Sequence, residues 1–271
     1  MKLVVTLCVF LLGYAGLALA FGTGEQGCGG DCTGCHKVSI QDAQDAVRKI
    51  DPLMNVEKIG PSPVPGLYQM VLSKENNPAK MIAYLDFSKR YLIKGTVMDT
   101  GNLVDLTRKS TREMLESQVV DVSRIKLDNA LLLGNPQGSR RLYLFSDPEC
   151  PYCAKLHEQL RQLVKKLPDL TVYILLLPLD IHPDSAWKTN SILTASKTDT
   201  GRALALLEES YNRKPVERIA STKDYAAEMK SLGKELGITS TPTLVYANGN
   251  IALGSKTAEE IEAGILKNPK P

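Results

Sequence analysis

The sequence predicts an α/β protein in which a small α+β domain precedes a larger α/β domain with an inserted helical region. Three features of the 271-residue chain lead to this prediction. Runs of β-forming residues separated by turn residues occupy positions 64–97, and a more polar helical pattern follows at 107–133. A buried-type strand at 141–146 then leads directly into a Cys-x-x-Cys pair and a helix. Strands alternating with helical segments are typical of an α/β fold.

The composition is that of a globular protein, with 43% hydrophobic and 23% charged residues. Lys and Arg number 33 against 30 Asp and Glu, so the chain is close to neutral. Nucleic-acid-binding domains usually carry a strong excess of basic residues. We therefore expect no nucleic-acid partner.

Residues 1–20 have the pattern of a signal peptide. Lys2 precedes an apolar run, Leu3–Leu19, and small residues lead up to Ala20. An uncleaved membrane anchor is the alternative, but Gly13 and Gly16 interrupt the run and favour cleavage after Ala20. We expect an exported, periplasmic protein.

The five cysteines that follow this signal-like segment fall into two groups. Cys28, Cys32 and Cys35 lie in the glycine- and cysteine-rich segment 21–38, and Cys150 and Cys153 lie in the second half of the chain. Two cysteines three residues apart close too small a loop to stabilise a fold strongly. Such pairs usually serve redox exchange, metal binding or haem attachment.

The sequence Cys32-Thr33-Gly34-Cys35-His36 matches the pattern for covalent attachment of c-type haem. In that reading Cys32 and Cys35 form the thioether bonds and His36 is the iron ligand. Two alternatives stay open: a second redox pair, or a small metal site that also uses Cys28.

Residues 39–106 read as a small α+β domain. A helix is expected from Ser39 to Asp51, with Ile40, Ala43, Val47 and Ile50 on one face. Turn residues separate the strands expected after it: Val64–Leu72, Met81–Leu85 and Tyr91–Val97. A module of this size buries a small core, so it would gain stability from a partner surface.

Residues 107–135 are expected to form a linker, helical from Thr107 to Leu133, and residues 136–271 a catalytic domain. The elements expected there are a β-α-β unit, a helical insertion and a final hairpin and helix: Arg141–Ser146, a helix through Lys166, Leu170–Leu177, helices within 183–236, Thr243–Tyr246, Ile251–Leu253 and Thr257–Leu266.

The Cys150-Pro151-Tyr152-Cys153 pair opens the helix that follows the first of these strands. A thiol at a helix N-terminus meets the positive end of the helix dipole, which favours the reactive thiolate. We therefore expect Cys150 to be the exposed nucleophile and Cys153 the resolving thiol, with Asp147 and Glu149 opposing ionisation. Inert core thiols and a zinc site including His157 are the alternatives.

Thr241-Pro242 directly precedes the strand of the final hairpin, about 90 residues after the cysteine pair. Strand, Cys-x-x-Cys, helix, and then proline, hairpin, helix is the order of a thioredoxin-like fold. In such folds this proline is cis and faces the thiols. We therefore expect a thioredoxin-like catalytic domain with a helical insertion, and we include Thr241 and Pro242 in its site.

The chain resembles the DsbC/DsbG family of periplasmic disulfide isomerases over nearly its whole mature length. Three segments carry the resemblance in the second half, Phe145–Cys153, Lys155–Gln159 and Gly237–Thr243. In the first half, Tyr91–Asp99 and Asn102–Thr107 resemble the dimerisation domain of that family.

This resemblance implies a V-shaped homodimer whose apolar cleft holds misoxidised exported proteins while the dithiol reshuffles their disulfides. It also implies a membrane reductant of the DsbD type. The family often has a second disulfide in the catalytic domain, but no cysteine follows Cys153, so packing alone must hold the insertion. Trp187 is expected to fill its core.

Three rival functions stay open. The Pro151-Tyr152 dipeptide, as in DsbG, allows a reductase of single oxidised cysteines (sulfenic acids). A haem at Cys32–His36 would make an electron-transfer protein that feeds the dithiol. A chaperone-like binding module would use the cleft, with the thiols secondary.

Overall fold

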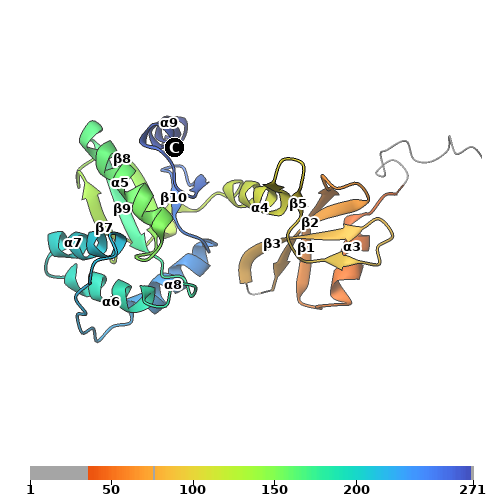
Figure 1. The fold of residues 1–271 in the computed structure, drawn as a ribbon, viewed down its shortest axis with the longest axis horizontal. Coiled ribbons are helices and arrows are strands. Elements are labelled where there is room, and N and C mark those ends of the chain that lie inside the picture. The colour runs from red at the N-terminus through yellow and green to blue at the C-terminus, as the bar shows by residue number, and fades with distance from the viewer. Residues whose placement is uncertain (1–35, 76, 270–271) are drawn as a thin grey trace, which may run out of the picture.

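The computed structural model describes residues 36–75 and 77–269, which form two lobes with helix α4 (Leu106–Glu116) lying between them (Figure 1). Each lobe has its own hydrophobic core, one built from residues 38–85 and one from residues 120–261. The α/β class and the two-domain organisation expected from the sequence are confirmed.

The N-terminal lobe packs helix α3 (Ile40–Arg48) on an antiparallel sheet. The strands follow one another in chain order: β1 (Met54–Pro61), β2 (Leu67–Lys74), β3 (Asn77–Asp86) and β4 (Leu92–Ile93). Ser39 caps α3 by accepting a hydrogen bond from the Asp42 N–H, and the Asp42 carboxylate accepts one from the Ser39 N–H, so the helix begins at the predicted place.

Three details of this lobe differ from the sequence prediction, and the first is that the strand expected at Tyr91–Val97 is only the two-residue β4. Ala43 and Val47 are buried as expected, but Ile40 and Ile50 are exposed, because the helix ends at Arg48 and turns only a narrow face to the sheet. Strand β1 was not predicted, since its Asn, Lys, Gly and Pro residues have low strand propensity. Pairing with β2 along most of its length makes it a strand.

The linker also differs from the prediction. Helix α4 ends at Glu116 and not at Leu133, and a short hairpin of β5 (Met98–Asp99) and β6 (Val104–Asp105) precedes it. Residues Leu131–Gly134 form strand β7, which pairs with a strand of the second lobe. Three consecutive leucines are compatible with a helix or with a buried strand. Pairing with β9 (Leu170–Leu176) makes this segment a strand. The second lobe therefore begins upstream of residue 136.

The second lobe has the order predicted for a thioredoxin-like domain, and that prediction is confirmed. Strands β8 and β9 are parallel and joined by helix α5, and a hairpin and helix close the chain. The sheet order is β11-β10-β8-β9-β7. The bounds are β8 (Arg140–Ser146), α5 (Pro151–Lys166), β9 (Leu170–Leu176), β10 (Thr243–Val245), β11 (Ile251–Leu253) and α9 (Ala258–Lys267).

Three helices between β9 and β10 form the predicted insertion: α6 (Ser185–Ala195), α7 (Thr200–Tyr211) and α8 (Tyr225–Leu236). Several of its apolar side chains, including Ile192, Leu206 and Leu207, are fully buried in the core of the domain. Trp187 is only partly buried, and the guanidinium of Arg218 lies 4.2 Å from its ring centroid. The tryptophan therefore covers the edge of the insertion more than it fills the core.

Candidate active site

The two cysteines lie where strand β8 passes into helix α5. Strand β8 ends at Ser146, Cys150 is the N-cap of the helix, and Pro151 is its first residue. Proline suits this position because its missing N–H would be unpaired there in any case. Cys150 makes no side-chain capping bond, but its sulfur lies close to the N–H groups of Tyr152 and Cys153 in the first turn. Both thiols are free.

Several contacts stabilise the Cys150 thiolate and lower its pKa to about 6. The largest contribution is a hydrogen bond with the Cys153 thiol. The main-chain N–H groups of Cys153 and Tyr152 also lower the pKa, whereas burial opposes them. A thiol with this pKa is largely thiolate at neutral pH, and the thiolate is the form that attacks disulfides.

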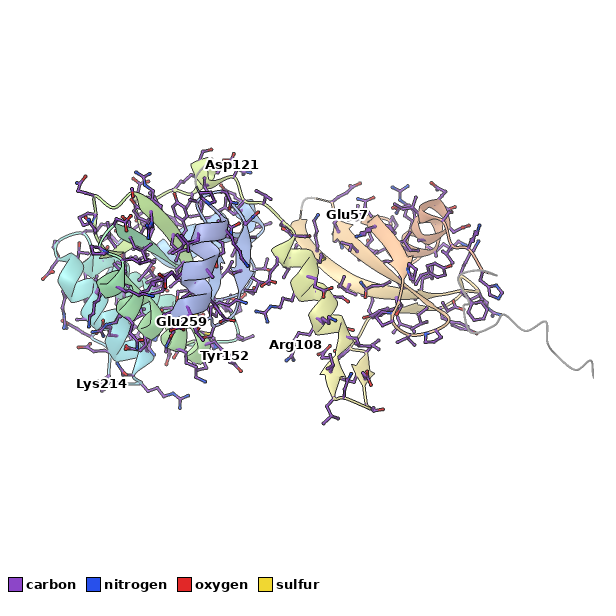
Figure 2. All side chains as sticks on the ribbon, turned by 90° about the horizontal axis from the view of Figure 1, so that it is seen from above. Glu57, Arg108, Asp121, Tyr152, Lys214 and Glu259 are labelled. Carbon is purple, nitrogen blue, oxygen red and sulfur yellow. The ribbon has the colours of Figure 1, made fainter. Side chains whose placement is uncertain are left out.

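Cys150 is less accessible than the sequence suggested, and the expectation of an exposed thiol is wrong. Only 5% of its surface is exposed. The segment Thr241-Pro242 lies against it, with the Thr241 carbonyl oxygen 3.9 Å from the Cys150 sulfur. Tyr152, in contrast, is 60% exposed at the margin of the domain (Figure 2). The thiol is therefore largely covered, while an aromatic ring two residues further along the chain is exposed.

Cys153 has the opposite environment. It has no exposed surface, and burial raises its pKa well above the ordinary thiol value. The nearby Cys150 raises the pKa further, while the Asp147 N–H, 3.4 Å from the Cys153 sulfur, and the Ser146 side chain lower it. Two thiols with pKa values moved apart can act as an attacking and a resolving group.

The Thr241-Pro242 peptide bond is cis, which confirms the prediction for this bond. Strand β10 begins at the next residue, Thr243, and pairs with Phe145 of β8. This pairing brings the proline-containing turn to the end of the sheet from which the cysteine pair emerges. The turn and the cysteines are distant in the sequence and adjacent in the fold.

The two acidic residues before Cys150 are both paired. Asp147 is fully buried, accepts hydrogen bonds from the N–H groups of Leu179 and Glu149 at 2.7 Å, and lies 3.0 Å from His182 Nδ1. Glu149 lies 2.9 Å from Lys188 Nζ. These partners offset the negative charge that the sequence alone predicts will oppose ionisation of Cys150.

Four residues near the thiols were missed from the sequence: Ser146, His182, Lys188 and Tyr211. Ser146 was within reach of sequence reasoning, because it ends the strand before the cysteine pair. The other three come from the insertion or the segment leading into it. They are so distant along the chain from the cysteines that no local sequence pattern indicates their proximity. His157, considered as a zinc ligand, is buried beside Tyr211 and lies 3.6 Å from Glu208.

The N-terminal cysteines Cys28, Cys32 and Cys35 lie outside the described residues. His36 packs on Phe87, with ring centroids 4.5 Å apart, and its carbonyl accepts a hydrogen bond from the Tyr68 hydroxyl. Within residues 36–75 and 77–269, no group of three or more His, Cys, Asp or Glu side chains is arranged to hold a metal ion. Haem at Cys32, Cys35 and His36 stays a prediction.

A strand, Cys-x-x-Cys and helix unit facing a cis proline defines the class: a dithiol oxidoreductase of thioredoxin-like fold. Comparison with known protein families supports this classification. Residues 127–267 match the model of the thioredoxin-like domain, and residues 37–108 match that of the disulfide bond isomerase protein N-terminal domain. The chain belongs to the thioredoxin-like domain family, and its N-terminal part has the disulfide isomerase N-terminal domain that makes it similar to DsbC-type thiol:disulfide interchange proteins.

Individual relatives carry matching names. A probable thiol:disulfide interchange protein DsbC of Bordetella avium is 28% identical over 235 residues, covering 83% of this chain and 75% of the relative. DsbC of Escherichia coli K12 is 24% identical over 212 residues, covering 78% and 82%. DsbG of Pseudomonas aeruginosa is 29% identical over 178 residues, covering 62% and 66%.

Among solved structures, the disulfide interchange protein from Neisseria gonorrhoeae is 31% identical. The match covers 54% of this chain and all of that one, with a TM-score of 0.45.

Proposed function

We propose that the protein is a disulfide isomerase and reductase that acts on misoxidised exported proteins through Cys150 and Cys153. The observation that carries this proposal is the Cys150 sulfur, with its pKa lowered to about 6, beside the Thr241 carbonyl and cis-Pro242. The isomerase-type N-terminal domain on the same chain supports it.

The chemistry is a series of thiolate exchanges. The Cys150 thiolate attacks one sulfur of a substrate disulfide, forms a mixed disulfide and expels a substrate thiolate. That thiolate can attack another disulfide of the same substrate until one returns to expel Cys150, which is isomerisation. When Cys153 attacks the Cys150 sulfur instead, the substrate leaves reduced and the enzyme holds the Cys150–Cys153 disulfide.

A homodimer is the proposed assembly, formed through the N-terminal lobe. Among the described residues, large exposed apolar side chains concentrate in one stretch of that lobe: Phe87, Tyr91, Ile93, Met98, Leu103 and Val104. Leu103 is 79% exposed and has a φ of 59°, which is uncommon for a bulky residue. Exposed apolar surface of this kind marks an interaction site.

The dimer is tested by Leu103→Asn, because asparagine tolerates this backbone conformation and only the apolar side chain is lost. Sedimentation should show weaker association of this variant and unchanged association of the control Ile50→Asn, which alters an exposed residue outside the stretch. A monomeric parent protein would contradict the proposed assembly.

The proposed location is the periplasm, on the basis of the signal-like residues 1–20, which lie outside the described part of the chain. None of the helices that the structure describes is long and apolar enough to cross a membrane. Since isomerisation needs the dithiol form, the proposed electron source is a membrane reductant of the DsbD type.

Refolding of a scrambled multi-disulfide protein in glutathione buffer tests the proposed activity. The protein should speed recovery of the native pairing, and Cys150→Ser should abolish the gain. A rate no faster than glutathione alone would contradict isomerisation, and reduction of a protein sulfenic acid by the same preparation would then favour the DsbG-type alternative.

The predicted haem has a separate test. Exported holoprotein should show a Soret band and the added mass of haem if Cys32 and Cys35 carry it. A spectrum without the band would end the electron-transfer alternative and leave a thiol pair or a metal site at the N-terminal cluster.

A further inference from the structure

The linker between the two lobes covers the outer edge of strand β11. Among the strands that the structure describes, β11 is the last in the order of its sheet, so its outer side faces no further strand. Val120 donates its N–H to the Gly249 carbonyl at 2.9 Å, and Val119 forms a single β-bridge with Asn250. A strand edge has main-chain groups that need partners. The linker supplies them at the start of this edge.

Two side chains of helix α4 continue this cover at Leu253, the last residue of β11. Glu116 accepts a hydrogen bond from the Leu253 N–H at 2.9 Å, and Arg112 donates one to the Leu253 carbonyl. The two side chains are four residues apart on one helix face, and Arg112 Nε lies 3.2 Å from Glu116 Oε1. Together they satisfy both main-chain groups of one residue, as a neighbouring strand would. We call this pair the linker clamp.

Leu253 lies at the active-site end of the sheet. It pairs with the first residue of β10, which directly follows cis-Pro242. The next N–H along the chain, that of Gly254, donates to the Pro242 carbonyl at 2.9 Å. On the other side of the cis bond, the Thr241 carbonyl oxygen lies 3.9 Å from the Cys150 sulfur. A continuous series of main-chain contacts therefore runs from the linker clamp to the nucleophile.

Helix α4 also lies close to the cis-proline turn (residues 239–242). Leu115 and Gln118 line a small pocket together with Thr239 and Ser240 of that turn. On the side of the sheet, the Thr243 hydroxyl donates to the Ser240 carbonyl at 2.7 Å. The turn is thus held between the linker on one side and strand β10 on the other.

The opposite end of α4 is fixed on the N-terminal lobe. The Thr107 hydroxyl lies 2.7 Å from the Oη of Tyr84, a buried residue of β3, and accepts a hydrogen bond from the Val97 N–H at 2.9 Å. Helix α4 therefore has contacts with both lobes, between which it lies (Figure 1). Its placement on the first lobe is joined to the active-site end of the second.

We propose that Arg112 and Glu116 position the cis-proline turn over the Cys150 sulfur, so that the linker helix controls access to the nucleophile. Both are positioning residues, since they act through the main chain of Leu253 and do not touch the reacting sulfur. Only 5% of the Cys150 surface is exposed, so a small displacement of the turn changes its access strongly. The inference rests on the proposed role of Cys150 as the nucleophile.

The variants for the test remove one contact of the linker clamp at a time. Glu116→Ala removes the acceptor of the Leu253 N–H, whereas Glu116→Gln keeps an oxygen acceptor and should restore the contact. Arg112→Met removes the donor to the Leu253 carbonyl and keeps a long side chain that favours helix. The matched controls are Glu113→Ala and Arg108→Met, because both alter exposed residues of the same helix.

Two measurements on the reduced protein report the two ends of the series of contacts. Hydrogen exchange of the Leu253 amide, followed by NMR, reports the linker clamp, and the amides of β9 report global opening in the same experiment. The rate of Cys150 alkylation by iodoacetamide at about pH 8, where the thiol is ionised, reports access to the nucleophile.

In Glu116→Ala, the Leu253 amide should exchange about tenfold faster and Cys150 should be alkylated about threefold faster, because loss of a charged acceptor loosens the turn. Arg112→Met should raise the alkylation rate about twofold. Glu116→Gln should lie within about twofold of the parent in both measurements. The two control variants and the β9 amides should match the parent.

Faster exchange at Leu253 without faster alkylation of Cys150 would overturn the inference, because the linker clamp would then hold the linker without positioning the turn. Equally faster exchange of the β9 amides in Glu116→Ala would also overturn it, since the effect would be global. Neither measurement needs a protein substrate. Failure of the refolding assay would therefore count against isomerisation and leave this result in place, and failure here would leave isomerisation in place.

Discussion

The carboxylate of Asp147 lies 3.0 Å from Nδ1 of His182, on the inner side of the turn that carries Cys150, and none of the Asp147 surface is exposed. Two main-chain N–H groups complete the shell of this carboxylate. A buried charge is tolerated only when its partners are in place. Asp147 is therefore the anchor that joins the nucleophile turn to the segment after β9.

Replacement of Asp147 should destabilise the fold. Asp147→Ala leaves the N–H groups of Leu179 and Glu149 without their acceptor and removes the carboxylate beside His182, so it should lower the free energy of unfolding by about 3 kcal/mol. The matched control is Asp184→Ala, because Asp184 is exposed and makes no side-chain capping bond. Urea unfolding measures both. If both variants lose the same small amount of unfolding free energy, the contacts of Asp147 contribute little to stability.

Lys188 should tune the nucleophile through Glu149. Lys188→Gln removes the cation paired with the Glu149 carboxylate and leaves it only the Asp184 N–H, so the negative charge next to Cys150 should raise the thiol pKa from about 6. The rate of alkylation at pH 6 should fall about twofold. Lys165→Gln, an exposed lysine on α5, should leave the rate unchanged. An unchanged rate in Lys188→Gln would mean that solvent screens Glu149 fully.

Much of the catalytic domain could be predicted from the sequence, because its signals are local. The apolar strand at 141–146, the cysteines directly after it and the Thr-Pro before the last hairpin each specify an element by neighbouring residues. The predicted cis bond at Pro242 is found, and α5 ends at Lys166 as expected.

The parts that were missed depend on contacts distant in the chain. Strand β7 was assigned to a linker helix because its three leucines have no strand-specific pattern before β9 pairs with them. The burial of Cys150 arises from the Thr241-Pro242 segment, and Tyr211 reaches Ser146 from a helix of the insertion. The spacing of neighbouring residues in the sequence does not indicate contacts between such distant segments.

Gly249 should be the least replaceable residue of the last hairpin. Its φ is 88°, and a Cβ there would overlap the carbonyl oxygen of Val120. The Gly249 carbonyl also accepts a hydrogen bond from the Val120 N–H at 2.9 Å, which ties the linker to the catalytic domain. Gly249→Ala should therefore lower the free energy of unfolding by about 2 to 3 kcal/mol.

Gly95→Ala is the control for this prediction, since a Cβ at Gly95 meets no atom within 4 Å. Its unfolding should match that of the parent within about 0.5 kcal/mol. Urea titration followed by circular dichroism compares the two variants. If both glycines tolerate alanine equally, the linker does not pack on the hairpin as described.

The pH dependence of Cys150 alkylation tests the central claim most directly. A thiol whose pKa is lowered to about 6 is mostly thiolate at pH 7, and its reactivity is lost as pH falls through about 6. Reduced protein treated with iodoacetamide, with the labelled site assigned by mass spectrometry, should give a half-maximal rate near pH 6 at Cys150 and no native-state labelling of Cys153. A half-maximal rate near the ordinary thiol value, or labelling of Cys153 before Cys150, would contradict the assignment of Cys150 as the activated nucleophile.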